Sequence, residues 1–170
     1  MAKRARVSTV GTLLLALAIV APTGASVAAS KRPALAGPDP VTGRHVALSQ
    51  YRGKPVLVNA WGSWCYGCRT EAPVLAAFAR AHRDAVVVIG LDTNDSKAGA
   101  RRFVTRYRIP YPSIFDPRGE IAGWWVRGVP STLVFDTRHR LVQRLEGTVT
   151  RAELERALRR LRARVTAIRR

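Results

Sequence analysis

The sequence is poor in cysteine: it has only two, and both lie in one stretch, "VNAWGSWCYGCRTEAP" (residues 58–73). A closed zinc site needs about four ligands, usually two close pairs. No second pair accompanies Cys65 and Cys68, and the three histidines are scattered, so we expect no metal. A purely structural disulfide is also disfavoured, because a loop closed over two intervening residues constrains little of the unfolded chain.

Acidic residues are scarce too, with 11 Asp and Glu against 29 Lys and Arg, a formal net charge of +18. Only four of the basic residues are lysine. Two interpretations fit this bias: a solvated, arginine-rich surface, or attraction to an anionic membrane surface or an acidic partner. No basic and aromatic binding motif is visible, so we expect no nucleic-acid partner.

Long hydrophobic runs are also missing. The apolar centre of the leader, residues 12–21, is short for a helix that must cross roughly 30 Å of hydrocarbon, but it has the length of a signal-peptide core. Pro22 and Gly24 then break it, and small residues follow. Residues 1–30 therefore predict a signal peptide or, because residues 7–30 carry no charge, an N-terminal membrane anchor. Either one predicts an exported, extracytoplasmic protein.

After the leader, apolar runs alternate with amphipathic stretches, without an internal repeat. We expect strands at 55–61, 85–91, 111–116, 131–136 and 141–147, and helices at 65–83, 97–108, 118–126 and from Thr150 onward. The last helix should begin at a capping box formed by Thr150 and Glu153. Helices that alternate with buried strands indicate an α/β protein with a mixed central β-sheet flanked by helices.

This pattern predicts one domain over residues 39–162, after an Ala-, Pro- and Gly-rich linker at 31–38 that we expect to be loose. Two short extended pieces around Thr42-Gly43 predict an N-terminal β-hairpin extension. Residues 163–170 form a basic C-terminal tail. The apolar seam of the last helix fits two arrangements, on a membrane surface or on the sheet, and we expect packing on the sheet up to Leu161.

Redox chemistry accounts for the two cysteines better than a metal site or a structural disulfide does. Cys65 follows a buried strand and opens a helix, where unpaired N–H groups and the helix dipole stabilise an anion. A thiolate is the nucleophile of disulfide exchange, so this position activates Cys65. Cys68 lies one helical turn further on, where it can resolve a mixed disulfide. We therefore expect Cys65 to be exposed and attacking, and Cys68 to be buried and resolving.

A proline stands directly before a predicted apolar strand in "RGVPST" (residues 127–132). In the trans form it would interrupt the hydrogen-bond ladder, so we expect Val129–Pro130 to be a cis peptide. That peptide would bring a backbone edge beside the disulfide and offer hydrogen bonds to a substrate chain.

Three motifs in order, "GKPVLVNAWGSWC", "CRTEAP" and "GVPSTLVFD", resemble the TlpA/ResA/CcmG (DsbE) group of exported, thioredoxin-like thiol-disulfide oxidoreductases. The resemblance covers residues 37–160 and implies the thioredoxin fold. It also implies an enzyme whose catalytic pair is Cys65 and Cys68. Such an enzyme needs no cofactor beyond this redox-active disulfide.

The resemblance also implies a substrate-binding surface, formed by Trp64, Tyr66, Gly67, Val129 and Pro130. Tyr66 would tune partner contact rather than chemistry. Gly67 departs from the proline that the family most often has there. Glycine loosens the first helical turn and stabilises the anionic thiolate less reliably.

Three further residues are candidates for tuning or proton transfer. Glu71 matches an acidic residue that commonly follows the motif, although it also fits a first-turn acid that interacts with the helix dipole. Asn59 replaces the buried Asp of ordinary thioredoxins, and Asn cannot shuttle a proton. ResA-like proteins use an acid near the end of the next strand, where Asp92 or Asp95 stands. We favour Asp92, because Asp95 fits a helix cap equally well.

Two redox directions remain open. A reductant of the cytochrome c maturation type would act on apocytochrome c, with electrons from a membrane donor; the family leans slightly this way. An oxidant, as in some DsbE-like relatives, would form disulfides in exported proteins. A peroxidase would have a lone cysteine in a Thr-x-x-Cys context, which is missing. A non-catalytic binding module, using the basic tail, is the other alternative. We expect a monomer.

Overall fold

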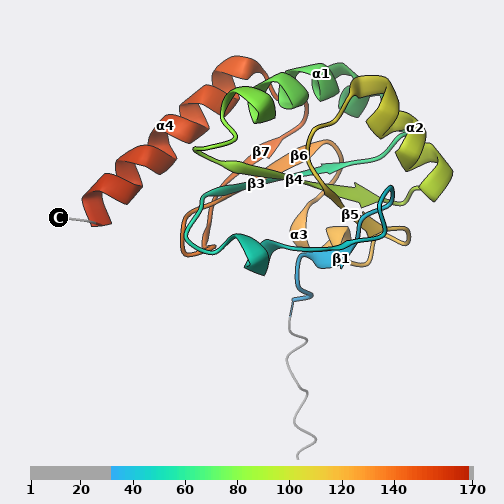
Figure 1. Ribbon diagram of the computed structural model, residues 1–170, viewed down its shortest axis with the longest axis horizontal. Coiled ribbons are helices and arrows are strands. Elements are labelled where there is room, and N and C mark those ends of the chain that lie inside the picture. Colours follow the sequence, from blue (N-terminus) through green and yellow to red (C-terminus); the bar gives the residue numbers. More distant parts are fainter. Residues whose placement is uncertain (1–31, 169–170) are drawn as a thin grey trace, which may run out of the picture. The chain divides into compact units, whose positions relative to one another are not determined.

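The computed structural model describes the backbone of residues 32–168 and the side chains of residues 32–164; the predicted leader and the end of the predicted tail lie outside this range. One central sheet is built from five strands, in the spatial order β5 (Ser113–Asp116), β4 (Val87–Thr93), β3 (Val56–Trp61), β6 (Ser131–Phe135) and β7 (Leu141–Glu146). Helices lie on both of its faces (Figure 1). The predicted mixed α/β architecture is therefore confirmed.

The strand directions bring two distant segments to one edge of the sheet. β3 is parallel to β4, and β4 is parallel to β5, so these three strands end at the same edge. β6 runs antiparallel to β3, with Ser131 opposite Ala60. The residues just after β3 and those just before β6 therefore meet. The first segment carries the two cysteines, and the second carries Pro130.

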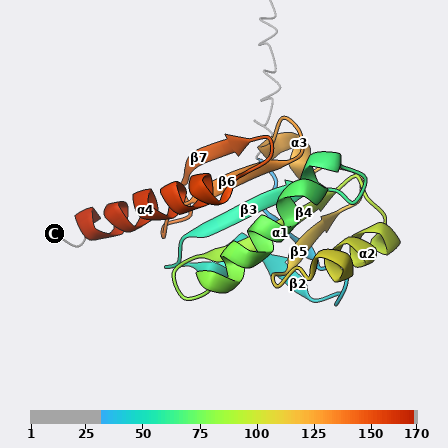
Figure 2. The ribbon, with the colours of Figure 1, turned by 90° about the horizontal axis from the view of Figure 1, so that it is seen from above.

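Within residues 32–168, four α-helices pack on the sheet: α1 (Tyr66–Ala81), α2 (Lys97–Tyr107), α3 (Ala122–Trp125) and α4 (Arg151–Ile168). Seen from above, α1 lies over the sheet between α2 and α4 (Figure 2). α4 begins at the predicted capping box: the Thr150 N–H donates to the Glu153 carboxylate at 2.8 Å, and the Glu153 N–H donates to the Thr150 hydroxyl at 3.3 Å.

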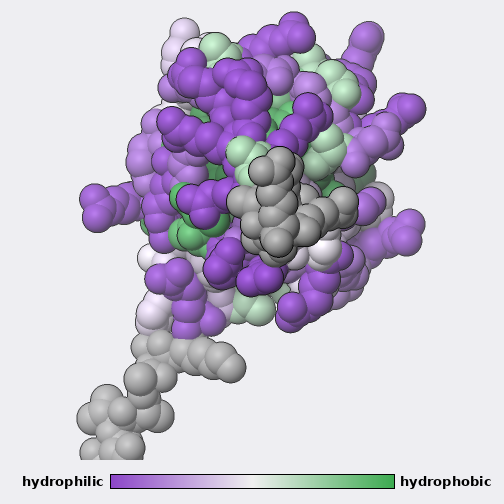
Figure 3. Space-filling view, turned by 90° about the vertical axis from the view of Figure 1, so that its left-hand side faces the viewer, coloured by the Kyte–Doolittle hydropathy of each residue, from purple (hydrophilic) through white to green (hydrophobic). Residues whose placement is uncertain are grey.

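The apolar seam of α4 packs on the fold as expected, because Leu154, Leu158 and Leu161 are all buried. The opposite side of the helix carries exposed arginines, among them Arg156 and Arg160. Figure 3 shows the face at this end of the molecule, where hydrophilic side chains dominate. Within residues 32–168, no helix has the length and apolar character needed to cross a membrane.

The N-terminal β-hairpin is confirmed, but the expectation of a loose segment before it is wrong. β1 (Ala36–Pro38) pairs antiparallel with β2 (His45–Ala47), which leads into the 3₁₀ helix η1 (Leu48–Tyr51). Leu35 is only 3% exposed and joins the core on the α3 side of the sheet. The Leu48 N–H donates to its carbonyl at 2.9 Å. Composition alone suggested looseness, because the partners that order this segment come later in the chain.

β4 runs two residues further than expected, ending at Thr93 instead of residue 91. Its pairing with β5 continues to Thr93 opposite Asp116, and this ladder extends the strand. Asp92 therefore lies inside a buried strand and not in the following turn. The turn ends at Ser96, whose hydroxyl caps α2 by accepting the Gly99 N–H at 3.0 Å.

Candidate active site

The cysteine pair lies where β3 leads into α1. Cys65 is the N-cap residue of α1 and has an extended backbone, with φ −77° and ψ 121°. Its Sγ accepts a hydrogen bond from the Cys68 N–H at 3.1 Å. The two sulfurs are joined in a disulfide, and the Cα atoms lie 5.3 Å apart. A thiolate at this N-cap would be stabilised by the positive end of the helix dipole and by the unpaired N–H groups.

The expectation that Cys65 is exposed is wrong for the disulfide form. Cys65 is 6% exposed and Cys68 1%, so both are buried, although Cys65 is the more accessible. Both belong to an apolar cluster with Trp61 and Phe103, whose stacked rings have centroids 4.4 Å apart, and Val129 packs against this cluster. The sequence predicted that Cys65 stands at the start of a helix. It did not predict that α2 and the loop before β6 would pack over the cysteines.

The Val129–Pro130 peptide is cis, as expected. The Pro130 ring lies close to the backbone of Gly67: a Cβ added to Gly67 would stand 3.2 Å from Pro130 Cδ and 2.9 Å from Thr148 Oγ1. Both distances are shorter than ordinary carbon contacts, so glycine permits this close approach. A proline at position 67 would also carry a Cβ. The packing in this chain therefore leaves little room for a side chain at position 67.

Two exposed rings flank Cys65 in the sequence. Trp64 is 53% exposed and Tyr66 is 83% exposed. The indole of Trp64 is held in place, since its Nε1 donates to the Asn94 carbonyl at 3.0 Å. Large, partly apolar rings around a reactive atom are suited to contact with another polypeptide.

Asp92 lies in β4 directly opposite Trp61 of β3. Side chains alternate along strands and directly paired residues share a face, so Asp92 lies on the side of the sheet that holds the cysteines. It is fully buried, and within the described chain neither of its carboxyl oxygens has a hydrogen-bond partner. Burial, reinforced by the nearby Asp95 and Asp116, raises the pKa of Asp92 to about 8. At neutral pH this carboxyl is mostly protonated.

Asp95, the alternative candidate for the proton-transferring acid, is hydrogen-bonded to the loop before the cysteines. One oxygen accepts the Ser63 N–H at 2.5 Å, and the other accepts the Ser63 hydroxyl at 2.9 Å and the Ser96 N–H at 2.7 Å. These bonds hold the turn that leads into Cys65. The geometry thus separates a loop anchor, Asp95, from a buried carboxyl with unpartnered oxygens, Asp92.

Glu71 is buried, with 1% exposure, so its interpretation as a first-turn acid at the helix dipole is wrong. Its carboxylate accepts the Asn59 side-chain amide at 2.8 Å and the Val149 N–H at 2.8 Å. Asn59 also donates to the Thr132 hydroxyl at 3.2 Å, so this network joins β3, α1 and β6. Burial raises the pKa of Glu71 to about 7, although both hydrogen bonds favour the ionised form.

Helical spacing could have revealed this burial. Cys68, Glu71 and Leu75 follow one another at intervals of three and four residues, which places them on one face of a helix. All three are buried in the structure. Because Cys68 had to face the interior to act as the resolving cysteine, Glu71 had to face it as well.

Comparisons with known proteins agree with this site. The model of the AhpC/TSA family matches residues 29–144. The chain belongs to the AhpC/TSA family. The thiol-disulfide oxidoreductase ResA of Bacillus thuringiensis is 28% identical over 121 residues, which is 70% of each chain. The thioredoxin-like protein YneN of Bacillus subtilis is 28% identical over 121 residues, covering 69% of this chain and 71% of YneN.

Two solved structures are also similar to this AhpC/TSA-family protein. A secreted thiol-disulfide isomerase from Corynebacterium glutamicum is 30% identical with a TM-score of 0.69, covering 77% of this chain and 84% of its own. A DsbF homologue from Corynebacterium diphtheriae is 31% identical with a TM-score of 0.69, covering 89% of this chain and 100% of its own. The thioredoxin fold is thereby confirmed, and the protein is a thiol-disulfide oxidoreductase.

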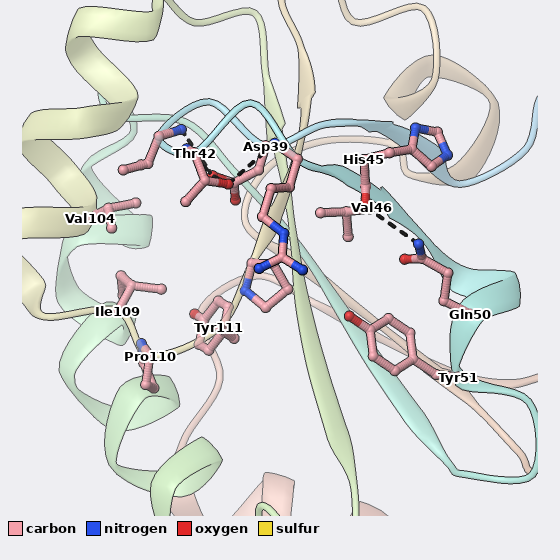
Figure 4. Close-up of a pocket in the computed structure, with 13 residues that line it drawn as sticks. Asp39, Thr42, His45, Val46, Gln50, Tyr51, Val104, Ile109, Pro110 and Tyr111 are labelled. Carbon is pink, nitrogen blue, oxygen red and sulfur yellow. Dashed lines mark hydrogen bonds between the residues drawn. The ribbon is translucent and has the colours of Figure 1, made fainter.

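A separate hollow of about 480 Å³ in this AhpC/TSA-family protein lies where the β1–β2 hairpin meets the segment between α2 and β5 (Figure 4). The Asp39 carboxylate there accepts the Thr42 N–H at 2.7 Å and the Ser113 N–H at 2.9 Å. Burial opposes ionisation, but these hydrogen bonds hold the pKa of Asp39 below its ordinary value. Ser113 begins β5, so the hollow lies at the edge of the sheet opposite to the cysteines. The hydrogen bonds of Asp39 hold the hairpin against the start of β5.

Proposed function

We propose that this protein is an extracytoplasmic reductase of protein disulfides. The observation that carries the proposal is the Cys65–Cys68 disulfide at a helix N-terminus, close to the cis Val129–Pro130 peptide. Thiol-disulfide exchange of this kind needs no metal and no organic cofactor. The exposed rings beside Cys65 and the backbone edge at Val129 would hold a polypeptide substrate.

In the reduced protein, the Cys65 thiolate attacks one sulfur of the substrate disulfide. A bond forms between Cys65 and that sulfur while the substrate S–S bond breaks, and the other substrate sulfur leaves as a thiolate that takes a proton from solvent. Cys68 loses its own proton and attacks Cys65 Sγ. The second substrate thiolate is released, and the Cys65–Cys68 disulfide forms. Two electrons have passed to the substrate.

We assign the proton of Cys68 to Asp92. A general base is most effective when its pKa lies near that of the acid it serves and near the working pH. Asp92 has a pKa of about 8 and unpartnered oxygens within the described chain, whereas the oxygens of Glu71 already accept two hydrogen bonds. The ionised form of Asp92, which is the minor form at neutral pH, takes the proton when Cys68 attacks, and the protonated form returns it to Cys68 when the electron donor reopens the disulfide.

The direction depends on competing charges near the sulfurs. Glu71 is buried on the cysteine side of the sheet, and its pKa of about 7 leaves it partly ionised at neutral pH. Negative charge there disfavours thiolates and hence the reduced form, whereas the Asp92 carboxyl is mostly neutral at this pH. This supports a reductant. An oxidant that forms disulfides is the second candidate, favoured by the N–H that Cys65 Sγ accepts at the helix start. We favour reduction because the buried, partly ionised Glu71 carboxyl opposes that single bond.

The compartment and the partners belong to the same proposal. The predicted leader of residues 1–30 supports export, and the similar isomerase of Corynebacterium glutamicum is described as secreted. The proposed substrates are disulfides of exported proteins, such as the haem-attachment pair of apocytochrome c. Electrons would come from a membrane donor, and the protein would act as a monomer.

The decisive experiment is the equilibrium reduction potential of the Cys65–Cys68 pair, titrated against dithiothreitol or glutathione. A value near that of thioredoxin, about −270 mV, supports the reductant. A value near about −120 mV identifies a disulfide donor, and the cytochrome role should then be abandoned. The absence of any reversible couple would overturn the redox assignment. A peptide with an oxidised haem-attachment pair then tests the substrate, with Cys65→Ser as the inactive control.

A further inference from the structure

A hollow of about 360 Å³ opens between α1 and α2. Three exposed arginines line it: Arg69 from α1, and Arg102 and Arg106 from α2. Ser63, which stands two residues before Cys65, is also part of its lining. The hollow therefore borders the loop that carries the attacking sulfur.

Aromatic rings form the apolar part of this hollow. Phe103 and Tyr107 line it, with ring centroids 4.7 Å apart. Phe103 also stacks on Trp61 and belongs to the apolar cluster that holds Cys65 and Cys68. A molecule in the hollow would thus contact the same packing that encloses the disulfide.

Within the described chain, the arginines of the hollow are not matched by acidic side chains in its lining. Arg102 and Arg106 are four residues apart on α2, a spacing at which like charges destabilise a helix. Neither forms an ion pair within the described chain, and the Arg106 guanidinium instead lies 5.8 Å from the Tyr107 ring. Asp95 is bonded to Ser63 of the lining, but its oxygens already accept protein donors.

Arg69, the third arginine of the hollow, binds a loop of the protein itself. Arg69 donates to the Ser63 carbonyl from Nε at 2.9 Å and from Nη2 at 2.8 Å, which fixes the loop before Cys65. Arg102 and Arg106 have no such bond to the loop. They are therefore the guanidinium groups open to an outside ligand, and guanidinium groups bind carboxylates through paired N–H donors.

We propose that this hollow binds a carboxylate-bearing segment of the substrate polypeptide, next to the disulfide that is exchanged. The proposal rests on the proposed function and adds a preference among its substrates. Charge complementarity argues for an acidic ligand. Trp64 and Tyr66, the neighbours of Cys65 in the sequence, are also exposed, which argues for a polypeptide rather than a small thiol.

The test compares two labelled peptides, each with one internal disulfide. They are identical except that one carries glutamates beside the disulfide and the other carries glutamines. Binding to the full-length oxidised protein is measured by fluorescence anisotropy. The test variant is Arg102→Gln with Arg106→Gln. The matched control is Arg156→Gln with Arg160→Gln, which removes the same charge at the same helical spacing from the exposed side of α4.

The acidic peptide should bind the unmodified protein more tightly than the neutral one, in a salt-dependent manner. Removing two exposed charge contacts should weaken this binding about five- to tenfold, from typical values for such pairs. The α4 control should change it by less than about twofold. Equal losses in both variants would mean that only net charge matters, and equal binding of the two peptides would mean that the hollow does not select acids. Either result overturns the proposal.

The outcome is separable from that of the proposed function. Binding is measured without electron transfer, so a protein without a reversible Cys65–Cys68 couple still gives a result. Conversely, if the reduced protein reduces both peptides at the same rate and Cys65→Ser abolishes this activity, the reductase stands and the acidic preference fails.

Discussion

Asp92→Asn tests the most unusual group of the site. It replaces a buried carboxyl with a neutral group of nearly the same shape. Within the described chain the oxygens of Asp92 accept no hydrogen bond that the substitution would remove. The variant therefore differs from the original protein chiefly in its inability to ionise.

The direction in which stability changes with pH follows from the raised pKa of Asp92, which is about 8 in the fold against an ordinary value of 3.8. The folded state disfavours the charged form, so the stabilising contribution is complete below pH 3.8 and is lost as the pH rises through 8. Each pH unit within this window costs about 1.4 kcal/mol. The stability advantage of Asp92→Asn should therefore be about 4 kcal/mol larger at pH 8 than at pH 5.

The assay is urea unfolding of the oxidised protein at both pH values, with free energies from linear extrapolation. Taking the difference between variant and original protein cancels the contribution of Glu71, whose pKa is also raised. Asp84→Asn is the matched control, because the Asp84 side chain is 95% exposed. If Asp92→Asn and the original protein lose stability in parallel between pH 5 and pH 8, the assigned burial of an ionisable Asp92 is refuted.

Three further substitutions test other parts of the site. Cys68→Ser should accumulate a mixed disulfide with substrate through Cys65, seen on non-reducing gels; no adduct would argue against Cys65 as the attacking thiol. Glu71→Gln leaves a buried donor without an acceptor and should cost about 1–2 kcal/mol in urea unfolding, so an unchanged midpoint would contradict the network. Gly67→Ala should lower stability by about 1–3 kcal/mol, since its Cβ meets the Pro130 ring; a higher melting temperature would show that the contact relaxes freely.

The sequence supports those features of the site that depend on local pattern. An apolar run followed by an amphipathic one predicted β3 and α1, and hence the place of Cys65 at the helix start. A proline directly before a buried strand predicted the cis peptide. Both inferences need only neighbouring residues, because propensity, capping and proline sterics act over a few positions.

The features that were missed depend on contacts between distant segments. The burial of Glu71 is completed by the Val149 N–H, 78 residues away in the chain. The order of β1 depends on a hairpin partner and on core contacts of Leu35. The arginine hollow combines a residue of α1 with two of α2, and nothing in either segment alone marks Arg102 and Arg106 as facing the site. Tertiary packing decides each of these.

The redox direction also reflects the balance between near and distant charges. A net charge of +18 creates a positive field that favours thiolates, but it is carried by exposed groups, and salt screens such groups within roughly 8–10 Å. The partly ionised carboxyl of Glu71 is buried on the cysteine side of the sheet, where screening is much weaker. Added salt should therefore weaken the effect of the exposed positive charges, which favours the reduced form. The effect of the buried negative charge, which opposes it, should remain largely intact. On this reasoning the potential of the Cys65–Cys68 pair should become more negative as ionic strength rises at neutral pH, and a shift to more positive values would contradict the assignment of the buried Glu71 carboxylate as the dominant charge.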